Sequence, residues 1–161
     1  MRKLYHIRWD ERAGAAANAR RGLPRLAAGY FARVRKLVAA EPSPDELHRL
    51  RLETKRLRYT LELFRPCYGP GLETRLAALR RLQQVLGEVN DSAVADRLLS
   101  NLMSASPQRV RVLRFLKERA AAKAQEFRKE WTGVFDAPGH EHWWSVYLAR
   151  HARTPGRRAG P

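Results

Sequence analysis

The chain has 161 residues, 44% of them hydrophobic, and its 32 Lys and Arg against 16 Asp and Glu give a formal net charge of +16. This length suits one domain with a buried core, and a single cysteine, Cys67, excludes an intrachain disulfide. No apolar run long enough to span a membrane and no signal-peptide core is present, so we expect a cytoplasmic protein without membrane insertion whose partner is a polyanion.

The spacing of apolar residues predicts helices along almost the whole chain. The first is expected from about Arg12 to Ala40, with Pro24 marking a start or a kink. Ser43 and Pro44 have the residue types of a helix cap and a first helical position. A second helix is therefore expected to begin there and to stop at Pro66.

A third helix is expected from Leu72 to a Gly end at Gly87, and a short fourth helix follows Asn90 and Asp91, which are cap-type residues. A fifth helix opens at Pro107. Short connections between helices predict an all-α antiparallel bundle of about five main helices with no sheet. We assign the bundle to residues 1–137, a short docking helix to 138–151 and a disordered basic tail to 152–161.

The most informative pattern lies between residues 48 and 64. Spacings of three and four place four basic residues in one helical stripe with Tyr59 at its edge, and four apolar residues in another stripe. The basic stripe is His48, Arg51, Lys55 and Arg58, and the apolar stripe is Leu50, Leu57, Leu61 and Phe64. Only Glu62 extends the basic row with an acid, so the pattern favours a polyanion-binding face over the alternative, a solvated helix face.

The segment LGEVND, residues 86–91, carries a second signal. One interpretation is a Gly helix end followed by a cap, in which Asp91 accepts backbone N–H groups of the next helix. Asp91 is equally suited to orient a basic side chain of the stripe, and the two roles are compatible.

Together these segments resemble the CHAD family, the conserved histidine α-helical domain. The resemblance spans about residues 45 to 100 and is specific in order and spacing. The segments that carry it are His48–Arg51, Lys55–Tyr59, Leu61–Glu62, Leu82–Gln83 and Leu86–Asp91.

The resemblance implies a helical bundle whose basic surface binds inorganic polyphosphate, in a family associated with polyphosphate granules and sometimes fused to triphosphate tunnel enzymes. His48 corresponds to the signature histidine, and its protonation would add a positive charge to the site. The implied basic ligands are Arg51, Lys55 and Arg58 with their neighbours Arg49 and Arg56, and Asp91 closes the second motif. Basic residues of other predicted helices extend the candidate site, namely Arg21, Arg25, Arg81 and Lys117.

Family members commonly hold two related halves, whereas this chain contains the signature once. We therefore expect a homodimer that polyphosphate strengthens. Leu52 and Leu63 lie outside both stripes and are candidates for a contact strip, the alternative being packing within their own chain.

Two other functions compete with polyphosphate binding. Nucleic acid fits the charge equally well, although no recognition-helix or RNA motif is present. A polyphosphate phosphatase or kinase needs carboxylates that hold a metal, and Glu62 and Asp91 are too few. Cys67 has no local histidine, and His140 and His142 have no third ligand nearby. We expect a protein that is not an enzyme and uses no metal or cofactor.

Overall fold

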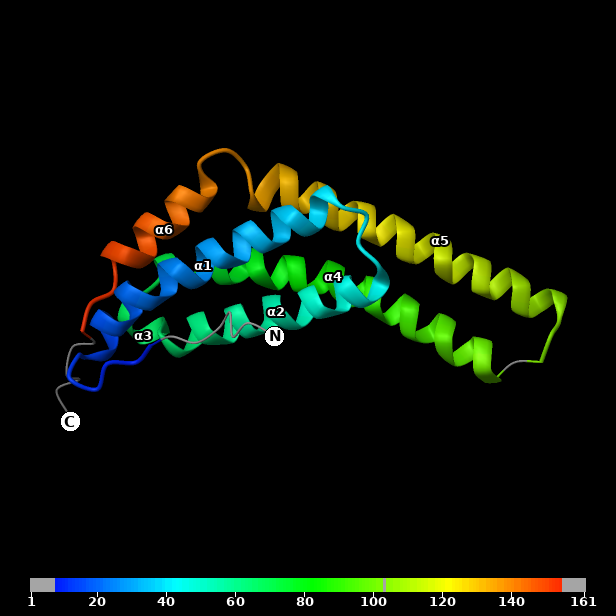
Figure 1. Cartoon of the computed structure of the whole chain (residues 1–161), viewed down its shortest axis with the longest axis horizontal. Helices are drawn as coiled ribbons and strands as arrows, with labels where there is room; N and C mark the ends of the chain where they lie inside the picture. Colours follow the sequence, from blue (N-terminus) through cyan, green and yellow to red (C-terminus); the bar gives the residue numbers. More distant parts are fainter. Residues whose placement is uncertain (1–7, 103, 155–161) are drawn as a thin grey trace.

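The structure is a computed structural model that describes residues 8–102 and 104–154, and in that part of the chain every regular element is a helix (Figure 1). In order these are α1 (Ala15–Ala39), α2 (Pro44–Leu63), α3 (Arg65–Tyr68), α4 (Gly71–Leu102), α5 (Pro107–Glu130), the π-helical turn η1 (Trp131–Phe135) and α6 (His140–Arg150). The predicted all-α helical bundle without a sheet is confirmed for these residues. Their helices include none with the length and apolarity needed to cross a bilayer.

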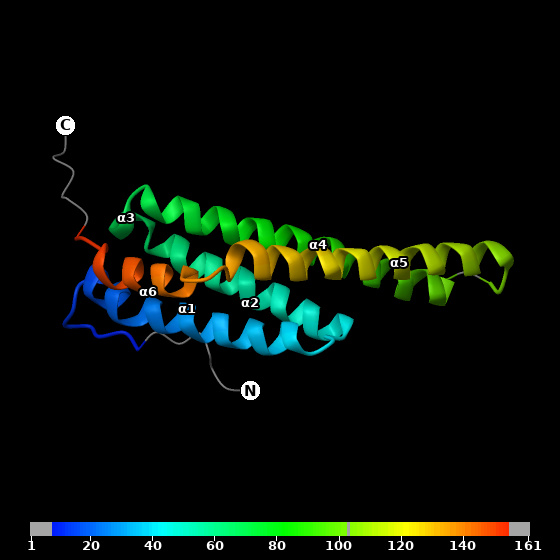
Figure 2. The ribbon, with the colours of Figure 1, turned by 90° about the horizontal axis from the view of Figure 1, so that it is seen from above.

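The helices form a bundle at one end of the molecule and a projecting hairpin at the other. In the bundle, α4 packs on α2 and α5, and α1 packs on α6 (Figures 1 and 2). The hairpin of α4 and α5 continues well past the ends of α1 and α2. We call its outer part, residues 94–102 and 107–119, the arm.

An aromatic cluster closes the core over α1. Tyr30 and Phe31 of α1 meet Trp131 and Phe135 of η1, with ring centroids 5.2 to 6.0 Å apart. Trp144 of α6 packs against Phe31 and Phe135 from above. All five rings are buried, so residues after the end of α5 complete the core.

The predicted start of α2 is confirmed. The Ser43 hydroxyl accepts a hydrogen bond from the Glu46 backbone N–H at 3.3 Å, and the Glu46 carboxylate accepts one from the Ser43 backbone N–H at 2.9 Å. Pro44 occupies the first turn, where its missing N–H costs nothing. This reciprocal cap fixes the point at which α2 stops covering α4.

The predicted break between the third and fourth helices is wrong. Residues 71–102 form one helix, so Gly87, Asn90 and Asp91 lie inside α4 rather than at helix ends. Leu82, Leu86 and Val89 continue one buried stripe through this region. Packing of that stripe outweighs the cost of about 1 kcal/mol that a helical glycine carries.

Two other expected boundaries also differ from the structure. Of the start or kink predicted at Pro24, the start is wrong, because α1 runs through Pro24 from Ala15. Helix α2 ends at Leu63, and Pro66 lies in the first turn of the short helix α3. Proline in a first turn is tolerated for the same reason as Pro44, so Pro66 starts a helix instead of stopping one.

The C-terminal helix α6 is held by a buried arginine of α4. The Arg75 guanidinium lies between two rings of α6, 3.5 Å from the Trp143 centroid and 3.6 Å from the Tyr147 centroid. It also donates to the carbonyl oxygens of Gly71 and Trp143. Burial lowers the pKa of Arg75 to about 10, because the charged form is poorly solvated there.

Beyond α6, two residues of the expected tail form hydrogen bonds through their backbone groups. Ala152 is buried and its carbonyl oxygen accepts from Arg20 of α1. The Arg153 backbone N–H donates to the Cys67 carbonyl at 2.8 Å. The rest of the predicted tail from residue 155 onward lies outside the described residues.

Candidate anion-binding site

The basic stripe of α2 lies against α4. His48, Arg51, Lys55 and Arg58 are all partly buried, while the apolar stripe of the same helix is buried in the core. Tyr59 is exposed beside the stripe, with the Arg58 guanidinium 4.3 Å and the Lys55 ammonium 5.6 Å from its ring centroid. The ring thus keeps both cations close to one place on the helix.

Between α2 and α4 lies a hollow of about 480 Å³, which we call the groove. Its lining residues are Arg51, Arg58, Arg80, Gln83, Gln84, Gly87, Glu88 and Asp91. A second hollow of about 380 Å³ lies farther along the same two helices, at His48 and Asn90. Three arginines from two helices therefore face one concave surface.

Arg51 is the least satisfied cation of the groove. Its Nε atom is buried and has no hydrogen-bond partner within residues 8–102 and 104–154. The side chain lies over Gly87, where an added Cβ would stand 3.6 Å from the Arg51 Nε. A buried donor without an acceptor costs about 1–3 kcal/mol, which an acceptor in the groove would remove once the Arg51 side chain turns its Nε toward it.

Arg58 is oriented by neighbours instead. Its Nε donates to the Gln83 side chain at 2.9 Å, and its terminal nitrogen pairs with Glu62 at 2.6 Å. Glu62 also lies 3.7 Å from Arg80. The sequence-based view of a row without local neutralisation is therefore wrong for Arg58, because Glu62 partly neutralises it.

The remaining acids near the groove have different surroundings. Glu88 pairs with Lys123 of α5 at 2.6 Å, and this hydrogen bond lowers the pKa of Glu88. Asp91 is exposed on the groove wall and makes no ion pair with a described cation. Its predicted role as a helix cap is wrong, since it lies inside α4.

His48 joins the two walls at one end of the site. Its Nδ1 lies 2.6 Å from the side-chain oxygen of Asn90. An amide oxygen can only accept, so in this arrangement Nδ1 carries the proton and donates it. Asn90 is a residue whose predicted capping role is wrong, and it lies instead opposite His48.

Other predicted site residues lie elsewhere. Arg49 and Arg56 are exposed on α2 but do not line the groove. Arg81 pairs with Glu126 and Glu130 of α5, and Lys117 belongs to a different hollow. On α1, Arg21 pairs with Asp10, and Arg25 is exposed.

Two groove residues, Arg80 and Gln83, were not among the residues singled out for the site. Both lie before Gly87 in the predicted third helix, and only the register between that helix and α2 shows that they face the groove. A continuous helix places residues 80, 83, 87 and 90 on one face at spacings of three and four, which is the signal that identifies them.

The residue types that could bind a metal ion or act as a nucleophile are dispersed over the described part of the chain. Among the described residues, no three His, Cys, Asp or Glu side chains come together in a group that could hold a metal ion. Cys67 is buried in the core, and this burial raises the pKa of its thiol.

Comparison with known proteins gives one match. The family model described as the CHAD domain matches residues 3–100, which include all of α1, α2 and α3 and most of α4. No curated protein and no solved structure matches the chain.

Proposed function

This chain belongs to the CHAD domain family, and from that membership we propose that its groove binds inorganic polyphosphate without altering it chemically. The ligand would lie between α2 and α4, with its phosphoryl oxygens facing Arg51, Arg58 and Arg80. Arginine offers two parallel N–H donors to a phosphate group, which suits a ligand recognised only by its anionic oxygens.

The observation that carries the proposal is the buried Arg51 Nε that lacks an acceptor in the part of the chain that the structure describes. A phosphoryl oxygen in the groove would supply that acceptor. Arg58 is already held by Gln83, so less side-chain entropy is lost when it engages a ligand.

A linear ligand fits the arrangement of the cations. The groove and the hollow at His48 follow the same two helices, so charged side chains recur along one direction. Polyphosphate repeats its anionic groups along a chain and has no bases that need recognition. Its affinity would attach the cytoplasmic protein to polyphosphate granules.

The acids beside the groove support binding without catalysis. Glu62 and Glu88 are both engaged in ion pairs with arginine or lysine, which leaves their carboxylates poorly suited to hold a catalytic magnesium ion. Asp91 is then the one acid lining the groove without an ion pair among the described residues, and a single carboxylate is a poor basis for a metal site. Phosphate release from polyphosphate, measured with and without magnesium, tests this part; turnover in either condition would contradict it.

Two copies would bring two grooves to one polyphosphate chain. Leu63 is 79% exposed, so the alternative of packing within its own chain is wrong for this residue among the described residues, whereas Leu52 is 37% exposed and is mostly covered by its own chain. We place the twofold contact of a ligand-bridged homodimer on these two leucines. Light scattering at micromolar protein should show a dimer with polyphosphate, and a strict monomer with and without ligand would contradict it.

The central experiment is a polyphosphate titration of the purified chain at several salt concentrations. Displacement of counterions makes the logarithm of affinity fall linearly with the logarithm of salt concentration. Competition with single- and double-stranded nucleic acid at fixed salt separates the two polyanions. Preferential binding of nucleic acid, or an affinity that does not change with salt, would contradict the proposal.

A further inference from the structure

The arm exposes apolar side chains that no part of the bundle covers. Twelve large hydrophobic residues are exposed among the described residues, and six of them belong to the arm. These six are Val94, Leu98, Leu102, Val110, Val112 and Phe115. Leu98 and Phe115 are 55% and 58% exposed, and a concentration of this kind on one element typically marks an interaction surface.

Part of this apolar surface continues a face that is covered elsewhere in the molecule. Within the bundle, α2 packs along α4. Because α2 begins at Pro44, the same face of α4 runs on without a neighbouring helix, and Val94 and Leu98 lie there beside His48 and Asn90.

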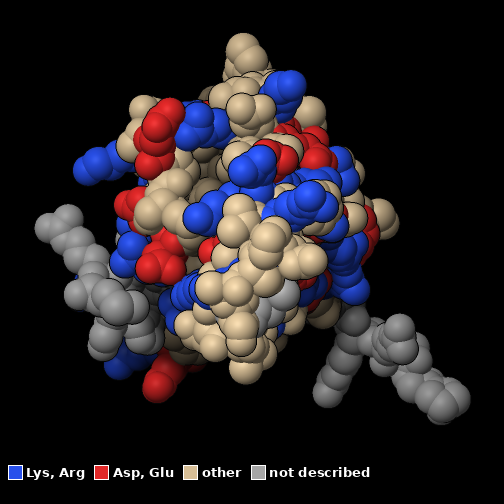
Figure 3. All heavy atoms as spheres, turned by 90° about the vertical axis from the view of Figure 1, so that its right-hand side faces the viewer, with Lys and Arg blue, Asp and Glu red and all other residues tan. Residues whose placement is uncertain are grey.

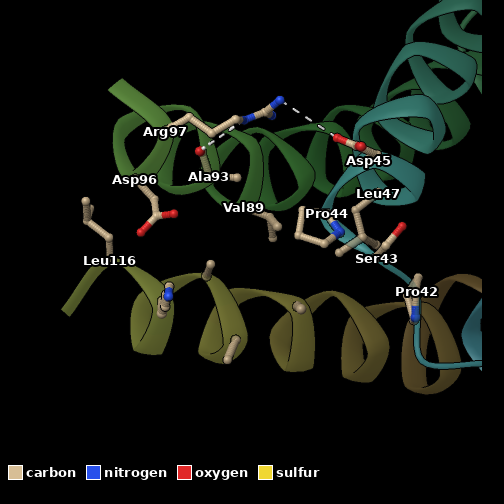
Figure 4. Close-up of a pocket in the computed structure, with 14 residues that line it drawn as sticks. Pro42, Ser43, Pro44, Asp45, Leu47, Val89, Ala93, Asp96, Arg97 and Leu116 are labelled. Atoms are coloured by element: carbon tan, nitrogen blue, oxygen red, sulfur yellow. Dashed lines mark hydrogen bonds and ion pairs between the residues drawn. The ribbon is translucent and has the colours of Figure 1, made fainter. Parts of the chain in front are cut away.

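A pocket lies where the arm leaves the bundle. It has a volume of about 520 Å³ and lies between α4, α5 and the loop before α2 (Figure 4). Its apolar lining is Pro42, Pro44, Leu47, Val89, Ala93, Leu116, Ala120, Ala121 and Ala124. Asp96 lies in this pocket with one carboxylate oxygen buried and without a hydrogen-bond partner among the described residues. We call this the shoulder pocket.

The charge of the arm is positive. Its two segments carry six Lys and Arg against two Asp and Glu, a net charge of +4. Arg111, Arg114, Lys117 and Arg119 form no ion pair within the described residues and are exposed. Figure 3 views the molecule from the arm's end, where blue side chains border the tan surface of the tip.

We propose that the arm and the shoulder pocket form a docking surface for an acidic amphipathic helix of a partner protein, one of whose bulky apolar side chains enters the pocket. Its apolar stripe would cover Val94, Leu98 and Val110, and its carboxylates would face the unpaired cations of α5. This function goes beyond polyanion binding. None of its residues lines the groove, although Val94 and Leu98 also line the hollow at His48.

Charge and shape favour this occupant over two others. A second copy would place one arm of charge +4 against another, so like charges would meet across the interface. An anionic bilayer matches the charge, but its flat surface cannot fill a concave pocket of about 520 Å³. An acidic helix satisfies both the charge and the pocket.

The probe is a synthetic amphipathic peptide of about 20 residues, long enough to cover the arm, with leucines at heptad spacing and glutamates at most other positions. Fluorescence anisotropy with the full chain at about 0.15 M salt should show saturable one-to-one binding. The same leucine pattern with lysine in place of glutamate should bind at least about tenfold more weakly.

Substitutions test which part of the surface binds the peptide. Leu98→Ser with Val110→Ser should lower peptide affinity at least about tenfold, and Ala120→Phe, which fills the shoulder pocket, should do the same. Val134→Ser removes an exposed apolar residue outside the arm and should leave affinity unchanged. Thermal unfolding of each variant confirms that it folds. Polyphosphate affinity should stay the same in Ala120→Phe, because Ala120 lines neither the groove nor the hollow at His48.

Three results would overturn the proposal. The first is loss of peptide binding in Arg51→Ala with Arg58→Ala, which would place the peptide in the groove. The second is a ligand-free dimer in sedimentation that the arm variant abolishes, which would assign the arm to a second copy. The third is arm-dependent binding to phosphatidylserine vesicles without binding of the peptide.

Discussion

The Nδ1 atom of His48 lies 2.6 Å from the side-chain oxygen of Asn90, and this hydrogen bond ties α2 to α4 across one end of the groove. The two residues are 42 positions apart in the chain and partly buried. His48 therefore helps to position the two walls of the site.

Asn90→Ala should lower the free energy of unfolding by about 1 kcal/mol, because His48 loses its acceptor in a partly buried place. Urea unfolding followed by circular dichroism measures the change. Asn101→Ala, at an exposed position of the same helix, is the control and should have little effect. Equal losses in the two variants would show that the hydrogen bond is not the cause.

Replacing Arg51 and Arg58 together by alanine should weaken polyphosphate binding much more than replacing Arg49 and Arg56. Both pairs remove the same charge from the same helix, but only the first pair lines the groove. Isothermal titration at one salt concentration compares them. Equal losses would mean that net charge, rather than the groove, governs affinity.

Gly87→Ala should raise the free energy of unfolding by about 0.5–1 kcal/mol, because alanine favours the helix and its Cβ would stand at an ordinary contact distance of 3.6 Å from Arg51. Gly71→Ala should do the opposite, since its Cβ would approach the Tyr147 hydroxyl to 2.8 Å. Thermal unfolding distinguishes them. Gly87→Leu fills the groove and should abolish polyphosphate binding in a folded protein.

Acid should weaken the cap of α2. Hydrogen bonds from the Ser43 backbone and hydroxyl lower the pKa of Glu46 below its ordinary value of 4.5. A carboxyl whose pKa is lowered by folding stabilises the fold above its ordinary pKa, and that stabilisation is lost as pH falls through the lowered value. The gap in Tm between the wild type and Glu46→Gln should therefore be present at neutral pH and disappear in strong acid.

Glu118→Gln is the control for this titration, because Glu118 is exposed on α5 and forms no ion pair within the described residues. Its difference in Tm from the wild type should not follow the same acid transition. A Glu46→Gln gap that stays constant down to the most acidic pH would contradict the role of the Glu46 carboxylate.

The sequence predicts a helix boundary correctly where the residues at that boundary determine it by themselves. Ser43 and Pro44 specify a helix start by their own hydrogen-bonding and conformational properties, and the structure confirms it. Gly87 has the residue type of a helix end, yet its conformation depends on the packing of Leu86 and Val89 against neighbouring helices. Such tertiary packing is not visible in a residue's own propensity.

The candidate site likewise contains residues that the sequence predicts and residues that depend on tertiary packing. Helical spacing placed Arg51 and Arg58 on one stripe, and both line the groove. The opposite wall required the register between α2 and α4, which the sequence does not contain, so Arg80 and Gln83 were missed and Asn90 was interpreted as a cap. Arg81 follows Arg80 by one position, and one position along a helix rotates the side chain by about 100° around the axis. Arg81 therefore faces Glu126 of α5 instead of the groove.

The order in which the chain is synthesised determines when the aromatic cluster over α1 can form. The walls of the groove, α2 and α4, leave the ribosome before Trp131, Phe135 and Trp144, which cover Tyr30 and Phe31. Until those last residues emerge, the rings of α1 lack their partners and stay open to water or to a chaperone. A fragment truncated at residue 100, where the family match ends, would keep α2 and the core residues up to Val89 but lose the aromatic rings that cover Tyr30 and Phe31.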